Sequence, residues 1–192
     1  MALRSDAAHW GSLAKVFHWL IVLAILVQGS VGLIMVNLPR RPSIIPVYSF
    51  HKSLGLTILA LALLRIVWRI LDRRPAPPSA MPRWQVIAAR ASHVLLYVLL
   101  FAVPLSGWLF DSTASLRPLF WWGIIRMPNL TGGPLPAWKE AAANLHATLF
   151  WTLFAVAALH AAAALKHHLI DRDDVLRRML PDRRDAVPST EN

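Results

Sequence analysis

Long apolar runs, separated by short polar segments, form the dominant pattern of this chain. A helix needs about 20 predominantly apolar residues to cross the hydrocarbon core of a bilayer, and four runs reach that length. The strands of a membrane barrel would alternate apolar and polar residues, and these runs show no such alternation. The pattern therefore predicts an all-α fold, an integral membrane four-helix bundle. The expected helices cover about 16–36, 47–71, 84–110 and 142–170.

The segments between the runs are polar or rich in proline. We expect a non-helical turn over 37–46 and a kink at Pro104 inside the third helix. The long connection over 111–136 has room for a short interfacial helix. We interpret 1–180 as one domain of four transmembrane helices, followed by a polar cytoplasmic tail over 181–192.

The composition supports a membrane protein and excludes several kinds of metal site. Of the 192 residues, 56% are hydrophobic and the mean hydropathy is +0.48, which is too apolar for an ordinary soluble domain. The absence of cysteine excludes disulfides, thiolate metal sites, iron–sulfur clusters and a covalently attached haem. The net charge of +10 does not indicate nucleic acid, because the basic residues flank the apolar runs.

The basic residues are distributed unequally between the two ends of the predicted helices. Fourteen lysines and arginines lie on the side of the N-terminus. The six on the opposite side are Arg40, Arg41, Lys52, Arg117, Arg126 and Lys139. Because cytoplasmic loops carry the excess of lysine and arginine, we expect both termini to lie in the cytoplasm.

Histidines lie at matching depths on different helices. His146 and His160 are fourteen residues apart on the fourth helix, which places them on one face and about 21 Å apart along the axis. Depth pairs His146 with His51, at the outer start of the second helix. His160 pairs with His18 or His93, at the inner starts of the first and third helices. Two imidazoles fill both axial positions of a haem iron, so the pattern predicts two non-covalent, bis-histidine haem b groups.

Each of these side chains also has a simpler interpretation. A single histidine near the end of a span is commonly an interfacial group in contact with water. Here four histidines pair by depth, which argues against a purely interfacial role. Arg65, fourteen residues after His51, is expected near the inner haem, where it suits a propionate unless it only snorkels to the surface. His167 shares a face with His160 and lies beside the inner site or in interfacial water.

Several stretches of the sequence resemble one known family. They are 17–20, 50–56, 61–69, 93–97, 104–107, 145–146 and 159–168. At these residues the chain resembles the bacterial cytochrome b561 family, the small four-helix dihaem membrane cytochromes. The resemblance runs from about His18 to Met179. Each stretch is weak alone, and the combination is specific.

The resemblance implies a ligand set and an activity. In that family the histidines of helices one and four bind the inner haem, which favours His18 over His93. The best-understood activity is superoxide oxidase, in the bacterial inner membrane. Electrons pass from superoxide at the periplasmic side to ubiquinone in the membrane. Related haem b subunits anchor redox enzymes in the membrane, which implies an alternative. In that case the chain is a cytochrome b subunit that passes electrons between quinone and a redox partner protein, a periplasmic dehydrogenase or hydrogenase. A non-redox bundle is the third interpretation.

The resemblance also gives the remaining candidate residues their roles. Quinone is expected at the cytoplasmic side near His160, Lys166 and His167, where interfacial polar groups can supply hydrogen bonds and protons. Lys52 follows His51 directly, so it is expected at the mouth of the outer haem site, where its charge would steer superoxide.

Overall fold

The computed structural model describes residues 2–7, 9–39, 41–73, 75–76, 81–114 and 118–180. Its four long helices are α1 (Ser12–Val36), α2 (Ile45–Leu71), α3 (Arg83–Ala114) and α4 (Pro136–Lys166). The shorter elements are η1 (Pro42–Ile44), β1 (Phe120–Trp121), β2 (Ile125–Arg126), η2 (His167–Asp171) and η3 (Arg177–Met179). Each long helix is long and apolar enough to cross a membrane. The prediction of an all-α integral membrane four-helix bundle is confirmed.

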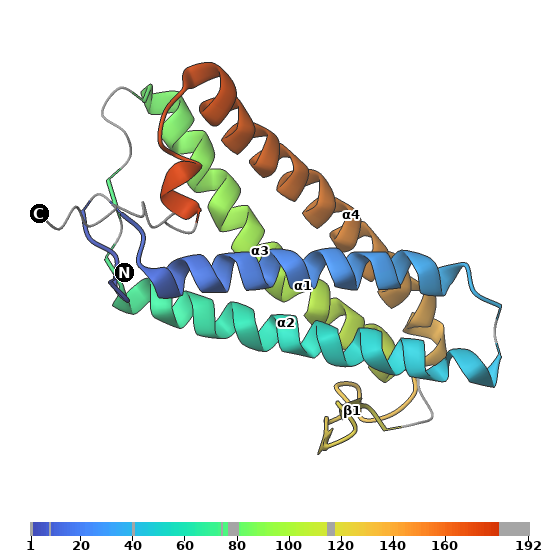
Figure 1. The fold of residues 1–192 in the computed structure, drawn as a ribbon. Helices are drawn as coiled ribbons and strands as arrows, with labels where there is room; N and C mark the ends of the chain where they lie inside the picture. The colour runs from blue at the N-terminus through green and yellow to red at the C-terminus, as the bar shows by residue number, and fades with distance from the viewer. Residues whose placement is uncertain are drawn as a thin grey trace, which may run out of the picture.

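The helices pack as two antiparallel pairs, α1 with α2 and α3 with α4, and contacts between α2 and α3 join the pairs (Figure 1). The N-terminal segment and η3 lie at the same end of the bundle. Hydrogen bonds hold this end together. Trp19 Nε1 donates to the Met179 carbonyl at 2.8 Å, and Ser5 Oγ donates to Asp72 at 2.6 Å. The polar segments that flank the spans therefore close this end of the bundle, which the distribution of basic residues predicts to be the inner one.

Most large apolar side chains face outward, and the buried core is small. Its central cluster consists of Ile21, Ile58, Ala62 and Leu100, from α1, α2 and α3. Lipid replaces water around a membrane protein, so outward apolar side chains cost nothing there. Ile21 lies one turn beyond His18 on α1, so the cluster fills the bundle between the two levels of histidines.

Prolines explain where two helices begin. Pro46 and Pro136 occupy the first turns of α2 and α4, where a missing N–H leaves no hydrogen bond unmade. The predicted non-helical turn over 37–46 is therefore too long, since η1 and the first residues of α2 lie within it. The expected start of the fourth helix at 142 is six residues late. α3 continues as a helix through Pro104.

The expected interfacial helix in the long outer connection is wrong. The described part of this connection, 118–135, instead contains an antiparallel hairpin in which Trp121 pairs with Ile125. Trp122 and Gly123 both have positive φ, 52° and 72°, and these turn the chain between the strands. Glycine adopts such a backbone freely, whereas Trp122 needs contacts to hold it there.

Candidate functional site

The outer pair of histidines comes from α2 and α4. The ring centres of His51 and His146 are 6.4 Å apart, and the rings are nearly perpendicular at 86°. Each imidazole lies against a glycine. A Cβ added to Gly32 would lie 3.1 Å from His51 Cε1, and one added to Gly107 would lie 2.9 Å from His146 Cε1. Only glycine leaves room for these two rings at their present positions.

Hydrogen bonds fix the orientation of His146. Its Nδ1 lies 3.0 Å from the Val103 carbonyl oxygen and 3.0 Å from Ser106 Oγ. A carbonyl oxygen only accepts, so the Val103 contact places the proton on Nδ1 and leaves Nε2 as the free nitrogen. Partners of this kind orient histidines that bind metals.

His51 is held differently. Gln28 Nε2 donates to the backbone carbonyl of His51 at 2.8 Å. The His51 Nδ1 atom is buried, and it has no hydrogen-bond partner among the described residues. Gln28 and Gly32 are four residues apart on one face of α1, and this face covers His51.

The inner group contains three imidazoles. The ring centres of His18 and His160 are 6.4 Å apart, at 75°, whereas those of His93 and His160 are only 5.2 Å apart. Imidazole nitrogens bind transition metals at about 2 Å, and each lies about 1.1 Å from its ring centre, so an ion between two rings would separate the centres by about 6.2 Å. The two 6.4 Å pairs fit this spacing, and the 5.2 Å pair is too close.

The structure brings Arg65 to the inner histidines. Its Nη1 lies 3.2 Å from His18 Nδ1, and its Nε donates to the Tyr97 hydroxyl at 3.1 Å. Arg69 lies over the same tyrosine ring, 5.3 Å from its centre. Arg65 therefore points into the bundle toward His18 and Tyr97. A side chain that only snorkelled to the membrane surface would not make these contacts.

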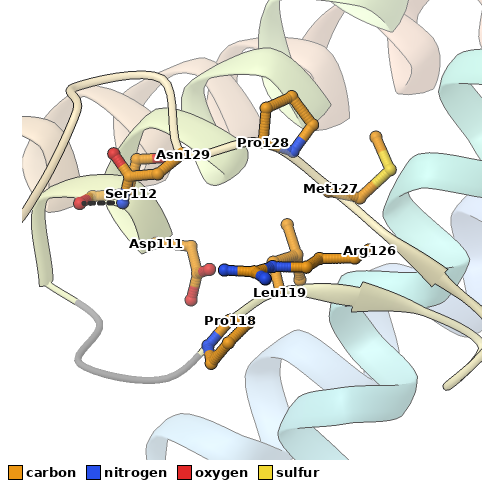
Figure 2. A pocket seen from close by; sticks show the side chains of 8 residues that line it. All are labelled: Asp111, Ser112, Pro118, Leu119, Arg126, Met127, Pro128 and Asn129. Atoms are coloured by element: carbon orange, nitrogen blue, oxygen red, sulfur yellow. Dashed lines mark hydrogen bonds between the residues drawn. The ribbon is translucent and has the colours of Figure 1, made fainter.

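At the outer end, Lys52 forms an ion pair with Asp111 of α3. The charge of Lys52 is therefore balanced locally, which its place after His51 did not reveal. Asp111 and Arg126 also line a cavity of about 350 Å³, in which Arg126 points toward Asp111 (Figure 2). Two other predicted outer cations, Arg40 and Arg117, lie outside the described residues.

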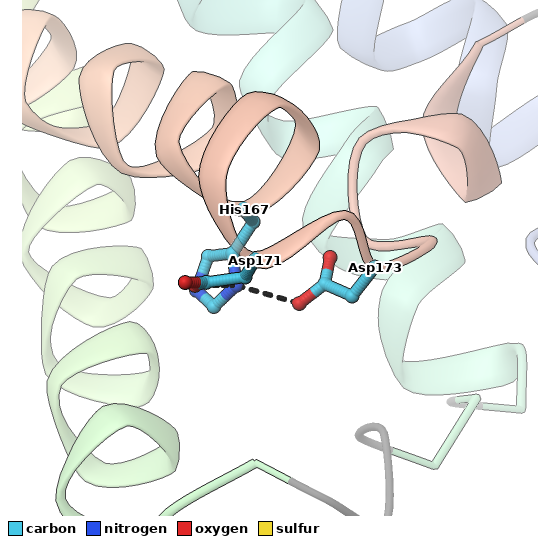
Figure 3. A group of neighbouring side chains, drawn as sticks. All are labelled: His167, Asp171 and Asp173. Carbon is cyan, nitrogen blue, oxygen red and sulfur yellow. Dashed lines mark hydrogen bonds and ion pairs between the residues drawn. The ribbon is translucent and has the colours of Figure 1, made fainter.

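At the inner end, two of the three predicted quinone-site residues, Lys166 and His167, contact carboxylates. Lys166 Nζ lies 2.6 Å from Asp171. His167 Nδ1 lies 2.7 Å from Asp173 and 3.1 Å from Asp171 (Figure 3). Arg172, with a left-handed φ of 53°, turns the chain so that Asp173 returns to His167. The spacing of four between His167 and Asp171 was the available sequence signal for this cluster.

Comparison with known proteins decides the family. A family model described as prokaryotic cytochrome b561 matches residues 9–182. The chain belongs to the prokaryotic cytochrome b561 family. This cytochrome is 35% identical to Cytochrome b561 homolog 2 of Escherichia coli (strain K12), over 94% of this chain and 95% of that protein. It is 31% identical to the Probable superoxide oxidase CybB of Yersinia pestis, over 87% of this chain and 93% of that protein.

As a member of this family, the protein is a membrane cytochrome that binds haem b and takes part in electron transport. The residues present fit that cofactor. Histidine is a haem-iron ligand, the chain has no cysteine for covalent attachment, and two imidazole pairs have the spacing that an ion between them requires. The sequence indicated the histidines, and it missed the supporting residues Gly32, Gly107, Ser106 and Gln28. Ser106 and Gly107 lie in the stretch 104–107 that carries the resemblance, and a glutamine and a glycine in the apolar first helix were the signals for Gln28 and Gly32.

Proposed function

We propose that this cytochrome is a superoxide:quinone oxidoreductase with two haem b groups. His18 and His160 would bind the inner haem, and His51 and His146 the outer one. The observation that carries this assignment is the 6.4 Å separation within each pair, which suits an iron between two imidazoles. When bound, the two haems supply a one-electron path between the outer and inner sides of the membrane.

The protein's own residues orient the ligands and the cofactor. The Val103 carbonyl holds the proton on Nδ1 of His146, so Nε2 is the nitrogen that would bind the iron. His18 Nδ1 accepts from Arg65 in this structure. When Nε2 of His18 binds a metal, Nδ1 carries the proton and can no longer accept. The guanidinium is then free to bind an anion, and a haem propionate is the partner we propose.

The overall reaction balances with two superoxide ions for each quinone. Each superoxide loses one electron and leaves as O₂. Ubiquinone takes up two electrons and two protons and becomes ubiquinol. The resemblance to a protein named as a probable superoxide oxidase supports this donor, at 31% identity. The outer position of one histidine pair suits a donor that arrives at the periplasmic surface.

Lys52 contributes to superoxide binding as part of a cluster. Lys52 and Arg126 carry two positive charges around the single carboxylate of Asp111, so this outer cluster has a net charge of +1. A local positive field raises the encounter rate of a small anion. We propose this cluster, rather than Lys52 alone, as the steering element.

Quinone would bind at the inner side, near His160, Lys166 and His167. Because the carboxylate of Asp173 accepts from Nδ1 of His167, Nε2 is the nitrogen left to face the quinone. When a proton from the cytoplasmic side also occupies Nε2, the imidazolium can pass it to the quinone oxygen. We also propose that residues 1–180 form one domain, with both termini in the cytoplasm and the helices across the bacterial inner membrane. The predicted tail over 181–192 lies outside the described residues.

Liposomes that contain the purified protein and ubiquinone test this function. Superoxide generated outside should reduce the quinone, and His93→Ala should retain this activity while His51→Ala loses it. Haems that are reduced by dithionite but not by superoxide would contradict the proposed donor. Co-purification of a dehydrogenase or hydrogenase that reduces the haems would then support the alternative, a cytochrome b subunit.

A further inference from the structure

The outer hairpin lies beside α2 and does not extend beyond its end. Trp121 Nε1 and Trp122 Nε1 both donate to Thr57 Oγ1, at 3.0 and 2.9 Å. The backbone N–H of Trp122 donates to Ser53 Oγ at 3.0 Å, and Trp122 packs edge-on against Phe50. Figure 1 shows the hairpin folded back along the outer half of α2. These contacts attach the hairpin to a membrane-spanning helix.

The depth of this attachment follows from the length of α2. Arg69 marks the inner end of the span. About 20 helical residues cross the hydrocarbon core, which places its outer boundary near residue 49. Thr57 lies about 12 Å below that boundary. Measured instead from the charged side chain of Lys52, Thr57 is still about 7.5 Å deeper. Both measures put the indole contacts within the outer leaflet.

The surface of the hairpin that faces away from α2 is apolar. Ile124 is 82% exposed, the highest value among the large hydrophobic residues of the described chain. Ile125 and Trp122 are 51% and 45% exposed. In water these side chains would expose a contiguous apolar surface, which is energetically unfavourable. Against lipid they need no protein cover, and tryptophan favours the membrane interface.

The backbone of the hairpin makes several hydrogen bonds within the protein. The two strands pair with each other, and Ile124 N donates to the Trp121 carbonyl at 3.0 Å. Met127 N donates to the Leu119 carbonyl at 2.9 Å. The exposed turn would normally use water for the N–H of Trp122, and here Ser53 accepts it. Backbone groups that enter a bilayer require such internal partners.

From these contacts we infer that the tip of the hairpin, residues 121–125, inserts into the outer leaflet, while Arg126 stays at the level of Asp111. The partner of this tip is the lipid bilayer, which contacts Trp122, Ile124 and Ile125. Thr57 holds the hairpin at this depth by accepting both indole N–H groups. The inference concerns the membrane contact of this loop and is independent of the electron donor and acceptor.

The absence of cysteine makes the test direct, since each variant carries a single thiol. A spin label at Ile124→Cys in liposomes should be accessible to oxygen and protected from a water-soluble nickel chelate. Leu23→Cys, on the outward face of α1, is the lipid control, and Arg41→Cys in the outer turn is the water control. Ile125→Cys provides a second label if Ile124→Cys folds poorly.

Three results are possible with this label. A profile like that of Leu23→Cys supports insertion. A profile like that of Arg41→Cys places the hairpin in water and overturns the inference. Low accessibility to both oxygen and the nickel chelate would show that the side chain packs against protein. That result would also overturn the inference. Pure liposomes contain no partner chain, so a docked second protein cannot produce the lipid profile.

A second variant tests the role of Thr57. Thr57→Val should raise the nickel accessibility of the label at 124 severalfold, because the indoles lose their shared acceptor. Thr152→Val is the matched control, since among the described residues that hydroxyl bonds only to its own helix, at the Thr148 carbonyl. Equal accessibility in the two variants would overturn the assignment of Thr57 as the attachment point.

Discussion

His146 Nδ1 lies 3.0 Å from the carbonyl oxygen of Val103, the residue before Pro104. The same carbonyl accepts from Ser106 Oγ at 2.7 Å, and Gly107 leaves the space that the imidazole fills. One turn of α3 thus supplies the acceptor, the hydroxyl and the gap for a histidine of α4. These supporting groups for His146 come from α3, a helix that provides no proposed ligand to the outer site.

Haem content should follow the proposed ligand pairs. Pyridine haemochrome assay of the purified protein should give two haems per chain. His146→Ala should lose one haem, because it removes an axial ligand of the outer site, and His18→Ala should lose the other. His93→Ala should keep both, since its 5.2 Å spacing to His160 leaves no room for an iron. If His93→Ala loses a haem while His18→Ala retains both haems, His93 and not His18 is the partner of His160 at the inner site.

Gly107→Ala should weaken the outer haem site. The new Cβ would lie 2.9 Å from His146 Cε1, and the ring cannot shift without losing its bonds to Val103 and Ser106. Overpacking of this kind costs about 1–3 kcal/mol. We expect faster loss of one haem during thermal denaturation, followed by absorption. Gly133→Ala is the control, because its added Cβ meets nothing within 4 Å. Similar haem loss in both variants would show that the fit at His146 does not matter.

Arg65→Gln should lower the reduction potential of the inner haem. A nearby positive charge favours the reduced form, and an interaction of about 1 kcal/mol corresponds to about 40 mV for a one-electron couple. Potentiometric titration followed by optical absorption measures both haems. The outer haem provides an internal reference, and Arg69→Gln tests whether a second cation at Tyr97 has the same effect. An unchanged inner potential in Arg65→Gln would separate Arg65 from the haem.

The outer charges should change the rate of haem reduction by superoxide. Lys52→Glu should slow it severalfold, while reduction by a neutral donor stays nearly constant. Asp111→Asn should have the opposite effect, because Lys52 then loses its counter-charge. Higher ionic strength should slow the parent protein. Stopped-flow absorption follows each reaction. Slower reduction in both variants would indicate structural damage at the ion pair and not steering.

His167→Ala should slow quinone reduction at the inner side. Removal of a general acid typically costs about 10²-fold or more in rate, and the haem spectra should remain normal. Asp173→Asn should give a smaller decrease, because His167 keeps its contact with Asp171 at 3.1 Å. Steady-state quinone reduction with a fast electron donor measures both. Normal turnover in His167→Ala, with full haem content, would move the quinone site elsewhere.

The spacing of residues was enough to predict the four spans and the depth of each histidine. An unbroken apolar run of sufficient length crosses a bilayer as a helix, because the helix satisfies all of its own backbone hydrogen bonds. The rise per residue of a helix is fixed, so spacing in the sequence gives depth in the membrane. His146 and His160 could therefore be assigned to opposite leaflets from the sequence alone. The fourteen-residue step from His51 to Arg65 likewise placed a cation at the inner level.

Lateral position required the tertiary structure. Depth left His18 and His93 equivalent as partners of His160, and only the packing of α1 and α3 around α4 gives them different distances from it. Packing also pairs Lys52 with Asp111, and the contact with Thr57 holds the aromatic loop as a hairpin where a helix was expected. Helix rotation, ion pairs between distant residues and the docking of a loop depend on contacts across the bundle. Sequence spacing fixes position along one helix, and it contains no information about the angle at which another helix approaches.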